Sequence, residues 1–462
     1  MTALGYFDTA PTDVASLVFR QLIRTVKHRD PLAFNILHGY LLEHQAIHYV
    51  DELIPLVAGS VEDHGGDIAL LGRHLLMNAA DREVVKFAIN LIGVCGGDED
   101  HSSLLTIGAH AEFSLFAVVA LGHAGGDIRA TWEMAKQTKG WGRIQCVERL
   151  DSEFDDADIK EWLLREGFKT AVMTEYLAAI CARRGGLLEA LESDLVDRGL
   201  LDGAAEILAA LARGKPGEGM SGYAQSACST ERFLAIIEQH ESPSVHWLLA
   251  CRDIERFART KSDDYTAGGW THEVLARCAQ AVALIRSRPV WHNVVAKGLE
   301  SDVDYEFNSA AEAAQIIGTD PWENRFRRLL SGKDQWYWLL ETTDPQRVDR
   351  VLEHACSHID LNAVASGYGD ALGGGRKYME HHKLDWILQA LQRWPERGAV
   401  FIEAGFRSPV VRNRWGAARA ALRWNPESRQ PFLETVQALH AIEEKAELRD
   451  ALARIIAGKC DL

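Results

Sequence analysis

His44 and His48 have the spacing at which two imidazoles can share a transition metal. Side chains four positions apart on an α-helix lie on the same face. If residues 32–50 form one continuous helix, both histidines lie in the middle of its apolar face. No third ligand for this pair is identifiable in the sequence. We therefore interpret the pair as histidines packed between helices, and we predict no metal site here.

A second group of potential ligands lies close together in the C-terminal part of the sequence: His354, Cys356, His358, His381 and His382. His354 and His358 again have the one-turn spacing, but they fall at the edge of the predicted apolar face. The group could form a site only if the fold brings its members together. We favour a solvated helix edge and predict no bound metal.

The segment 367–377 is the most unusual loop of the sequence, with five glycines before two cations. Consecutive backbone N–H groups in such a loop can surround a phosphate or a carboxylate. The candidate anion-binding residues are Gly373, Gly374, Gly375, Arg376 and Lys377. The loop matches neither a Walker A motif nor GxGxxG, and no strand is predicted before it. We favour a mobile loop between repeats over an anion site.

Ten of the 13 tryptophans lie at or after Trp247. Aromatic side chains in this part could line a groove for a peptide or an aromatic ligand, or they could pack in the core of a helical array. Core packing is the interpretation we favour. The residues concerned are Trp322, Trp336, Tyr337, Trp338, Trp386, Trp394, Trp415 and Trp424.

Motifs that would indicate an enzyme are missing from the sequence. It has no nucleophile elbow, HExxH, P-loop or kinase signature. The eight cysteines form no C-x-x-C pair, which argues against a disulfide framework and against a thiolate zinc site. We therefore predict no catalytic residues and no cofactor. The alternative is an enzyme, such as an oxygenase, with its site in the His- and Gly-rich C-terminal region.

The elements that would position these residues repeat about every thirty positions. Gly-Gly-Asp occurs at residues 65–67, 96–98 and 125–127, so the three triplets are almost evenly spaced. Glycine closes the last turn of a helix and aspartate caps the next one, so each triplet predicts a boundary between two helices. The apolar segments 82–93 and 111–122 align position by position without a gap, and they predict equivalent inner helices.

The repeats continue in degraded form and then change character. Segments 141–150 and 176–181 occupy the next two inner-helix positions. Residues 214–222 hold four glycines and a proline, so no helix is expected to cross them. We predict an N-terminal helical repeat array over residues 1–213, and a Trp-rich helical domain with degenerate repeats and a capping helix over residues 223–462.

Composition limits the possible partners. The chain has 462 residues, of which 47% are hydrophobic and 25% charged, as in folded globular proteins. Its net charge of −16 disfavours nucleic acid, and no apolar run is long enough to cross a bilayer. Residues 320–424 do not share this negative charge, because they contain 16 Lys and Arg against 13 Asp and Glu. We expect a cytoplasmic protein that binds no nucleic acid and no membrane.

Together, the thirty-residue helix pairs, the glycine stops with acidic restarts, and Val411-Arg412 before an Ala/Leu helix resemble HEAT-type repeats. The resemblance implies an all-α solenoid of stacked antiparallel helix pairs, and the segment 214–222 predicts its division into two halves. The segments 141–144 and 162–167 are also similar to bacterial HEAT-like proteins labelled limonene hydroxylases. The resemblance implies a fold and carries no activity with it.

An open solenoid presents a long surface on which a partner can bind. Polar residues at similar positions of successive inner helices are expected to mark that surface: Glu112, Arg143, Glu148 and Glu175. We predict that several of them share one face and form a mainly acidic groove. The predicted function is a non-enzymatic binding scaffold that holds a protein or a basic peptide.

Overall fold

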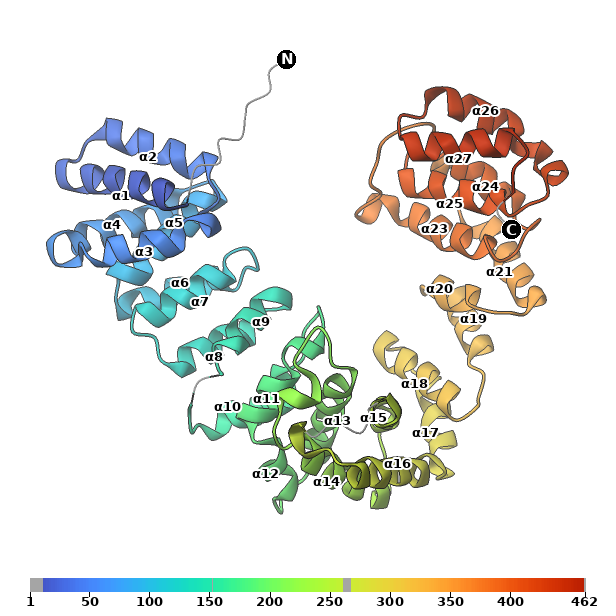
Figure 1. Cartoon of the computed structure of the whole chain (residues 1–462), viewed down its shortest axis with the longest axis horizontal. Coiled ribbons are helices and arrows are strands. Elements are labelled where there is room, and N and C mark those ends of the chain that lie inside the picture. The colour runs from blue at the N-terminus through green and yellow to red at the C-terminus, as the bar shows by residue number, and fades with distance from the viewer. Residues whose placement is uncertain (1–10, 152, 261–266, 461–462) are drawn as a thin grey trace. The chain divides into compact units, whose positions relative to one another are not determined.

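The computed structural model describes residues 11–151, 153–260 and 267–460. Within these ranges the chain forms 27 α-helices, and its only extended pairing is an isolated bridge between Ala371 and Val410. The protein is an all-α solenoid of stacked helix pairs, as the repeats predict (Figure 1). None of the described helices has the length and apolar character required to span a membrane. The chain divides into two compact units, Met1–Ile317 and Gly318–Leu462.

The first unit contains eighteen of the described α-helices. They are α1 (Pro11–His28), α2 (Pro31–Glu43), α3 (Val50–Ala58), α4 (Val61–Asn78), α5 (Arg82–Cys95), α6 (His101–Gly108), α7 (Ser114–His123), α8 (Ile128–Gln137), α9 (Gly140–Glu148), α10 (Ala157–Trp162), α11 (Ala178–Gly185), α12 (Leu187–Glu192), α13 (Arg198–Arg213), α14 (Ser226–Gln239), α15 (Val245–Thr260), α16 (His272–Arg286), α17 (Val290–Gly298) and α18 (Asp304–Ile316). The inner helix of each early pair packs on two sides: α5 contacts α4 and α7, and α7 contacts α6 and α9. This double contact requires apolar residues nearly all round the helix, which is the pattern that predicted these inner helices.

Two of the three Gly-Gly-Asp triplets lie between helices. Helix α5 ends at Cys95, and a 3₁₀ turn begins at Asp98. The third triplet separates α7 from α8, with Gly125 at a left-handed φ of 83° and Asp127 accepting a hydrogen bond from the Ala130 N–H at 2.9 Å. The first triplet, residues 65–67, does not separate two helices as predicted, because it lies inside α4. Burial of the apolar face of α4 against its neighbours outweighs the low helix propensity of two glycines.

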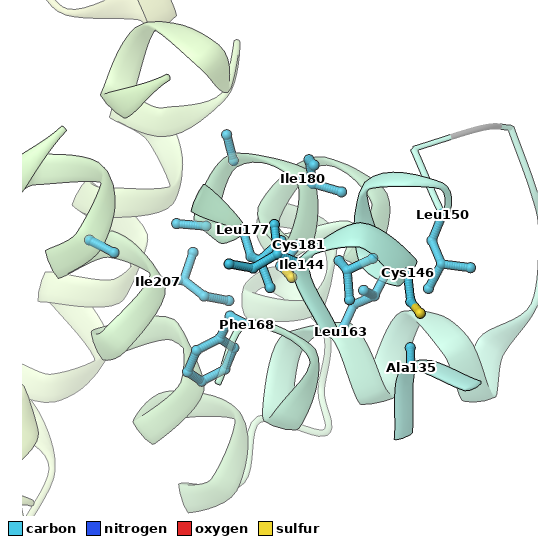
Figure 2. Close-up of a cluster of buried hydrophobic side chains, with 14 of the residues drawn as sticks. Ala135, Ile144, Cys146, Leu150, Leu163, Phe168, Leu177, Ile180, Cys181 and Ile207 are labelled. Atoms are coloured by element: carbon cyan, nitrogen blue, oxygen red, sulfur yellow. The ribbon is translucent and has the colours of Figure 1, made fainter. Parts of the chain in front are cut away.

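Within the first unit, successive repeats share one apolar core. Figure 2 shows a part of it, where side chains from α8, α9, α11 and α13 interdigitate. Cys146 and Cys181 are fully buried here and act as small apolar residues. Burial raises the pKa of the Cys146 thiol to about 11 and that of Cys181 further, so both stay protonated at neutral pH.

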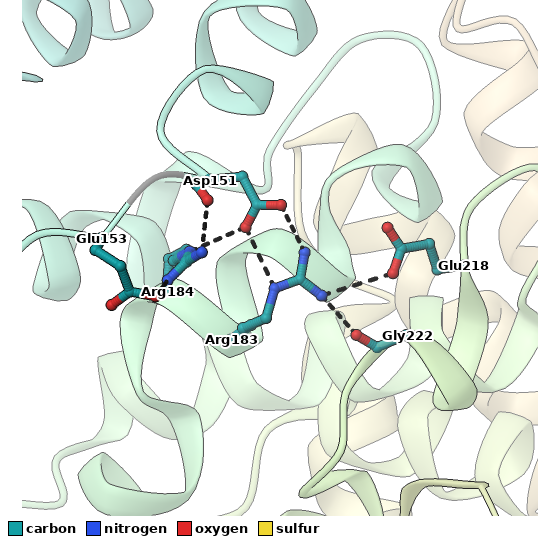
Figure 3. A network of polar contacts seen from close by, with 6 residues as sticks. All are labelled: Asp151, Glu153, Arg183, Arg184, Glu218 and Gly222. Atoms are coloured by element: carbon teal, nitrogen blue, oxygen red, sulfur yellow. Dashed lines mark hydrogen bonds and ion pairs between the residues drawn. The ribbon is translucent and has the colours of Figure 1, made fainter.

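Ion pairs also join successive repeats. In the network of Figure 3, Asp151 accepts from Arg183 at 2.8 Å and from Arg184 at 3.0 Å. Arg184 also pairs with Glu153 at 2.7 Å, and Arg183 donates to the carbonyl of Gly222 at 2.6 Å. Because these partners lie 31 to 39 positions apart, the contacts fix one repeat against the next.

Residues 214–222, predicted to link two domains, pack inside the first unit. They form turns and a 3₁₀ segment, and the side chain of Met220 is only 1% exposed. The backbone at Gly217 lies so close to the carbonyl of Glu175 that a Cβ there would overlap it. The compact units divide instead between Ile317 and Gly318, so the predicted boundary does not coincide with this division.

The second unit has a separate apolar core, to which Trp322, Leu339, Leu388 and Phe401 belong. Its helices are α19 (Trp322–Leu330), α20 (Trp336–Leu340), α21 (Pro345–His358), α22 (Leu361–Val364), α23 (Met379–Leu391), α24 (Ala399–Phe406), α25 (Val411–Leu422), α26 (Leu433–Ile442) and α27 (Ala446–Ile456).

Candidate functional site

A hollow of about 730 Å³ lies in the second unit, where α20, α23 and α25 meet the middle of the glycine-rich loop. Its volume is within the range of sites that hold a ligand or a few side chains of a partner. We call this hollow the α23 groove. The aromatic and charged residues that line it are Tyr337, Glu341, Asp385, Trp386, Arg393, Arg412, Trp415 and Arg419.

Helix periodicity explains why α23 presents aromatic and polar residues to the groove while its apolar residues face the core. Leu384, Ile387 and Leu388 are fully buried in the core. The groove-lining residues of α23 occupy the other face, and Trp386 lies there half-buried, with its ring centroid 5.0 Å from that of Tyr337. Aromatic residues that are already packed on one side lose little conformational entropy when a partner covers the other.

The carboxylates of the groove are held by arginines. Arg412 Nε lies 3.0 Å from Asp385 Oδ2, and the Gln389 amide donates to the same oxygen at 3.0 Å. Burial raises the pKa of the Asp385 carboxyl, and the charge of Arg412 opposes the rise. Arg393 pairs with Glu341 at 3.0 Å and also donates to the Leu340 carbonyl.

Arg419 is the groove cation without such a partner. Its guanidinium lies over the ring of Trp415, 5.3 Å from the centroid, and it has neither a hydrogen bond nor an ion pair with any residue that the structure describes. A guanidinium stacked on an indole keeps its N–H edges free for a planar anion. Arg419 and Trp415 therefore present a ready contact for a carboxylate.

Trp386 also lines a smaller hollow of about 320 Å³, and the second histidine pair is part of the lining of this hollow. The rings of His354 and His358 stack with centroids 3.8 Å apart. Burial lowers the pKa of His354, and the neighbouring His358 adds to the effect. Within the described ranges no three His, Cys, Asp or Glu side chains gather closely enough to hold a metal.

His44 and His48 do not lie on one helix, which corrects the predicted helix over residues 32–50. Helix α2 ends at Glu43, His44 is extended, and His48 ends a separate 3₁₀ turn. The cause is tertiary, because the Ala46 N–H donates to the Glu83 carboxylate of α5 at 2.8 Å. His48 is exposed and does not share an apolar face with His44.

The glycine-rich loop is tied to the segment that precedes α25. The Gly367 N–H donates to the Arg407 carbonyl at 2.9 Å, and the Ala371 N–H donates to the Pro409 carbonyl at 3.0 Å. Residues 373–377 follow this anchor, with Gly374, Gly375, Arg376 and Lys377 exposed. Anion binding by these residues stays a prediction. The loop contributes Ala371 and Leu372 to the α23 groove.

The four residues expected to form an acidic groove in the first unit do not form one together. Glu112 pairs with Lys86 at 2.6 Å, and Arg143 donates to the carbonyls of Thr138 and Lys169. Glu148 is exposed, but it is the last residue of α9, at the opposite end from Arg143.

Glu175 does not lie on an exposed face as expected. Its side chain is buried, with 8% of the residue exposed, and it pairs with Arg213 at 2.5 Å. Arg213 also holds the buried Asp253, which extends the ion pairs from α13 to α15. These side chains hold repeats together, so Glu175 cannot offer its charge to a partner.

Aromatic residues of the α23 groove were among the sequence candidates, but its arginines were not. Trp386, Tyr337 and Trp415 line the groove, whereas Trp336 and Trp424 are buried in the core. The signal that could have located the arginines is the local excess of basic residues between positions 320 and 424.

Comparisons with known proteins give only distant similarities. No family model matches the chain, and no curated protein matches it. Among solved structures, an engineered protein is 18% identical over 96% of this chain and 98% of its own, with a TM-score of 0.23. A circular tandem repeat protein with a novel repeat topology is 13% identical over 97% of this chain and 95% of its own, with a TM-score of 0.15. Similarity at this level adds nothing to the fold described above.

Proposed function

We propose that the protein is a non-enzymatic, HEAT-like binding scaffold that holds a peptide segment of a partner protein in the α23 groove. The observation that supports this proposal is the lining of the groove, where Tyr337, Trp386 and Trp415 stand beside three arginines. Tryptophan, tyrosine and arginine are the residue types that dominate binding energy at protein interfaces. In contrast, a hollow of about 880 Å³ in the first unit has neither tryptophan nor tyrosine in its lining.

Access to the groove supports a peptide as the occupant. Leu372, on the loop at its edge, is 90% exposed, and Tyr337 is 42% exposed. A large apolar side chain left that open gains free energy when a partner covers it, by roughly 25 cal/mol per Å² of buried area. The groove thus combines apolar area at its edge with guanidinium groups along its wall.

A displayed library of random peptides, selected on the full-length protein, tests the proposal. We expect enriched peptides that bind the wild-type protein and bind at least about tenfold more weakly after Trp386→Ala, a loss of about 1.4 kcal/mol. The matched control is Trp141→Ala, which removes a 52% exposed tryptophan from the first unit. The proposal fails if no peptide is enriched, or if both variants bind the enriched peptides as the wild type does.

A further inference from the structure

We infer that the α23 groove takes an acidic segment, whose carboxylates pair with Arg419 and Arg412 while an apolar side chain covers Trp386. This inference rests on the proposed function and specifies the chemistry of the partner. It differs from the sequence-based expectation, which placed a basic peptide on the first unit.

The inference depends on the excess of arginines over carboxylates in the groove. Its lining has three arginines, Arg393, Arg412 and Arg419, against two carboxylates, Glu341 and Asp385. Both carboxylates already have an arginine partner at 3.0 Å. An incoming carboxylate therefore meets an unmatched guanidinium at Arg419, whereas an incoming lysine meets three cations and no free acid among the groove residues.

The geometry at Arg419 favours a carboxylate in particular. The guanidinium of Arg419 lies over the ring of Trp415, 5.3 Å from its centroid, and the side chain is exposed. The N–H groups of a guanidinium lie in its plane and can donate two parallel hydrogen bonds to one carboxylate, which is the arrangement that makes arginine specific for this group.

The charge of the surroundings agrees with an acidic partner of limited length. Residues 318–462 contain 21 Lys and Arg against 20 Asp and Glu, a net charge of +1, which leaves −17 for residues 1–317. A long polyanion such as RNA would be repelled by a chain of net charge −16, whereas a short acidic segment needs only the local excess of cations.

The experiment measures fluorescence anisotropy of labelled twelve-residue peptides with the full-length protein. Three peptides share two leucines and a phenylalanine and differ only at four positions, occupied by Glu, Gln or Lys. A single-stranded RNA of twelve nucleotides is the fourth probe. We expect the Glu peptide to bind at least about tenfold more tightly than the Gln peptide, and to weaken as the salt concentration rises.

Charge reversal locates the contact. We expect Arg419→Glu to weaken the Glu peptide by at least about tenfold and to leave the Gln peptide within about twofold. Arg449→Glu is the matched control, because Arg449 is exposed on α27, outside the groove, and pairs with no described acid. Far-UV circular dichroism verifies that both variants keep their helix content.

The possible outcomes separate this inference from the proposed function. Equal binding of the Gln or Lys peptide, with sensitivity to Trp386→Ala, overturns the acidic partner and keeps the peptide-binding groove. Loss of affinity with Arg449→Glu equal to that with Arg419→Glu overturns the assigned contact. Groove-dependent binding of the RNA alone overturns both, because it replaces the peptide with a nucleic acid.

Discussion

Asp100 shows how a single buried carboxylate holds two repeats together. It is 4% exposed and accepts from Arg73 of α4 at 2.7 Å, and from the Gly97 N–H at 3.2 Å. The hydrogen bond from Arg73 is the main cause that lowers the pKa of Asp100. We expect Asp100→Asn to lower the free energy of unfolding by about 1–3 kcal/mol at pH 7, since the change weakens a charged hydrogen bond in a buried place.

This effect should depend on pH with a defined sign. A carboxylate whose pKa is lower in the folded state stabilises the fold above its ordinary value near 4, and the stabilisation is lost as pH falls through the lowered pKa. Urea unfolding of wild type and Asp100→Asn should thus differ equally at pH 7 and pH 5 and converge below about pH 4. Asp98→Asn is the control, because the Asp98 side chain is 92% exposed. A gap that persists unchanged at pH 3 would contradict the argument.

At the scale of the helix, two glycines in equivalent repeat positions predict opposite effects. Gly93 of α5 faces α7 so closely that a Cβ would lie 2.6 Å from the Ala120 Cα. Gly122 of α7, at the matching position of the next repeat, has open space where its Cβ would be. We expect Gly93→Ala to destabilise the protein by about 1–3 kcal/mol through overpacking, and Gly122→Ala to stabilise it by up to about 1 kcal/mol through helix propensity.

Thermal unfolding followed by circular dichroism compares these two variants, which carry the same chemical change. The midpoint of Gly93→Ala should fall and that of Gly122→Ala should stay or rise. Equal shifts in both variants would mean that α5 and α7 can separate without cost, and would contradict the close packing of inner helices on which the stack depends.

Local sequence predicts the inner helices well because their burial is a property of each helix. The gapless alignment of segments 82–93 and 111–122 reappears as α5 and α7 in adjacent repeats. Asp127 caps α8 as its position after two glycines indicates. In these cases the signal and its cause lie within a few residues of each other.

The features that sequence did not predict depend on partners far along the chain. Helix α2 ends before His44 because of a hydrogen bond between Ala46 and Glu83. Glu175 is buried because Arg213, 38 positions later, supplies the opposite charge. The arginines of the groove could not be predicted for the same reason. Arg393 and Arg412 form ion pairs with acidic residues, and the residues near Arg419 in the sequence do not show that Arg419 has no such pair.

For the whole molecule, the boundary between compact units decides which part can fold alone. The core of the first unit extends from Val14 to Ala314, and the core of the second begins at Trp322. A cut at residue 318 separates these two cores and breaks neither. A cut at residue 223 instead removes α13 from α15, and the fully buried Trp247 of α15 then loses its hydrogen bond to Asp202 of α13 at 2.7 Å.

We therefore expect the fragment 318–462 to fold by itself and the fragment 223–462 to expose the apolar face of α15. Both fragments contain the entire α23 groove. The shorter one also contains the complete core of the second unit, and it should therefore be monomeric, helical and cooperative in thermal unfolding. The longer one should bind a hydrophobic dye and aggregate, because uncovering a fully buried Trp and its apolar neighbours costs several kcal/mol. Size-exclusion chromatography and circular dichroism of the two fragments, prepared in parallel, provide the measurement. If the longer fragment were monomeric and cooperative and the shorter one unfolded, the division at Gly214–Gly222 would be the right one and the second unit would need α14–α18 to fold.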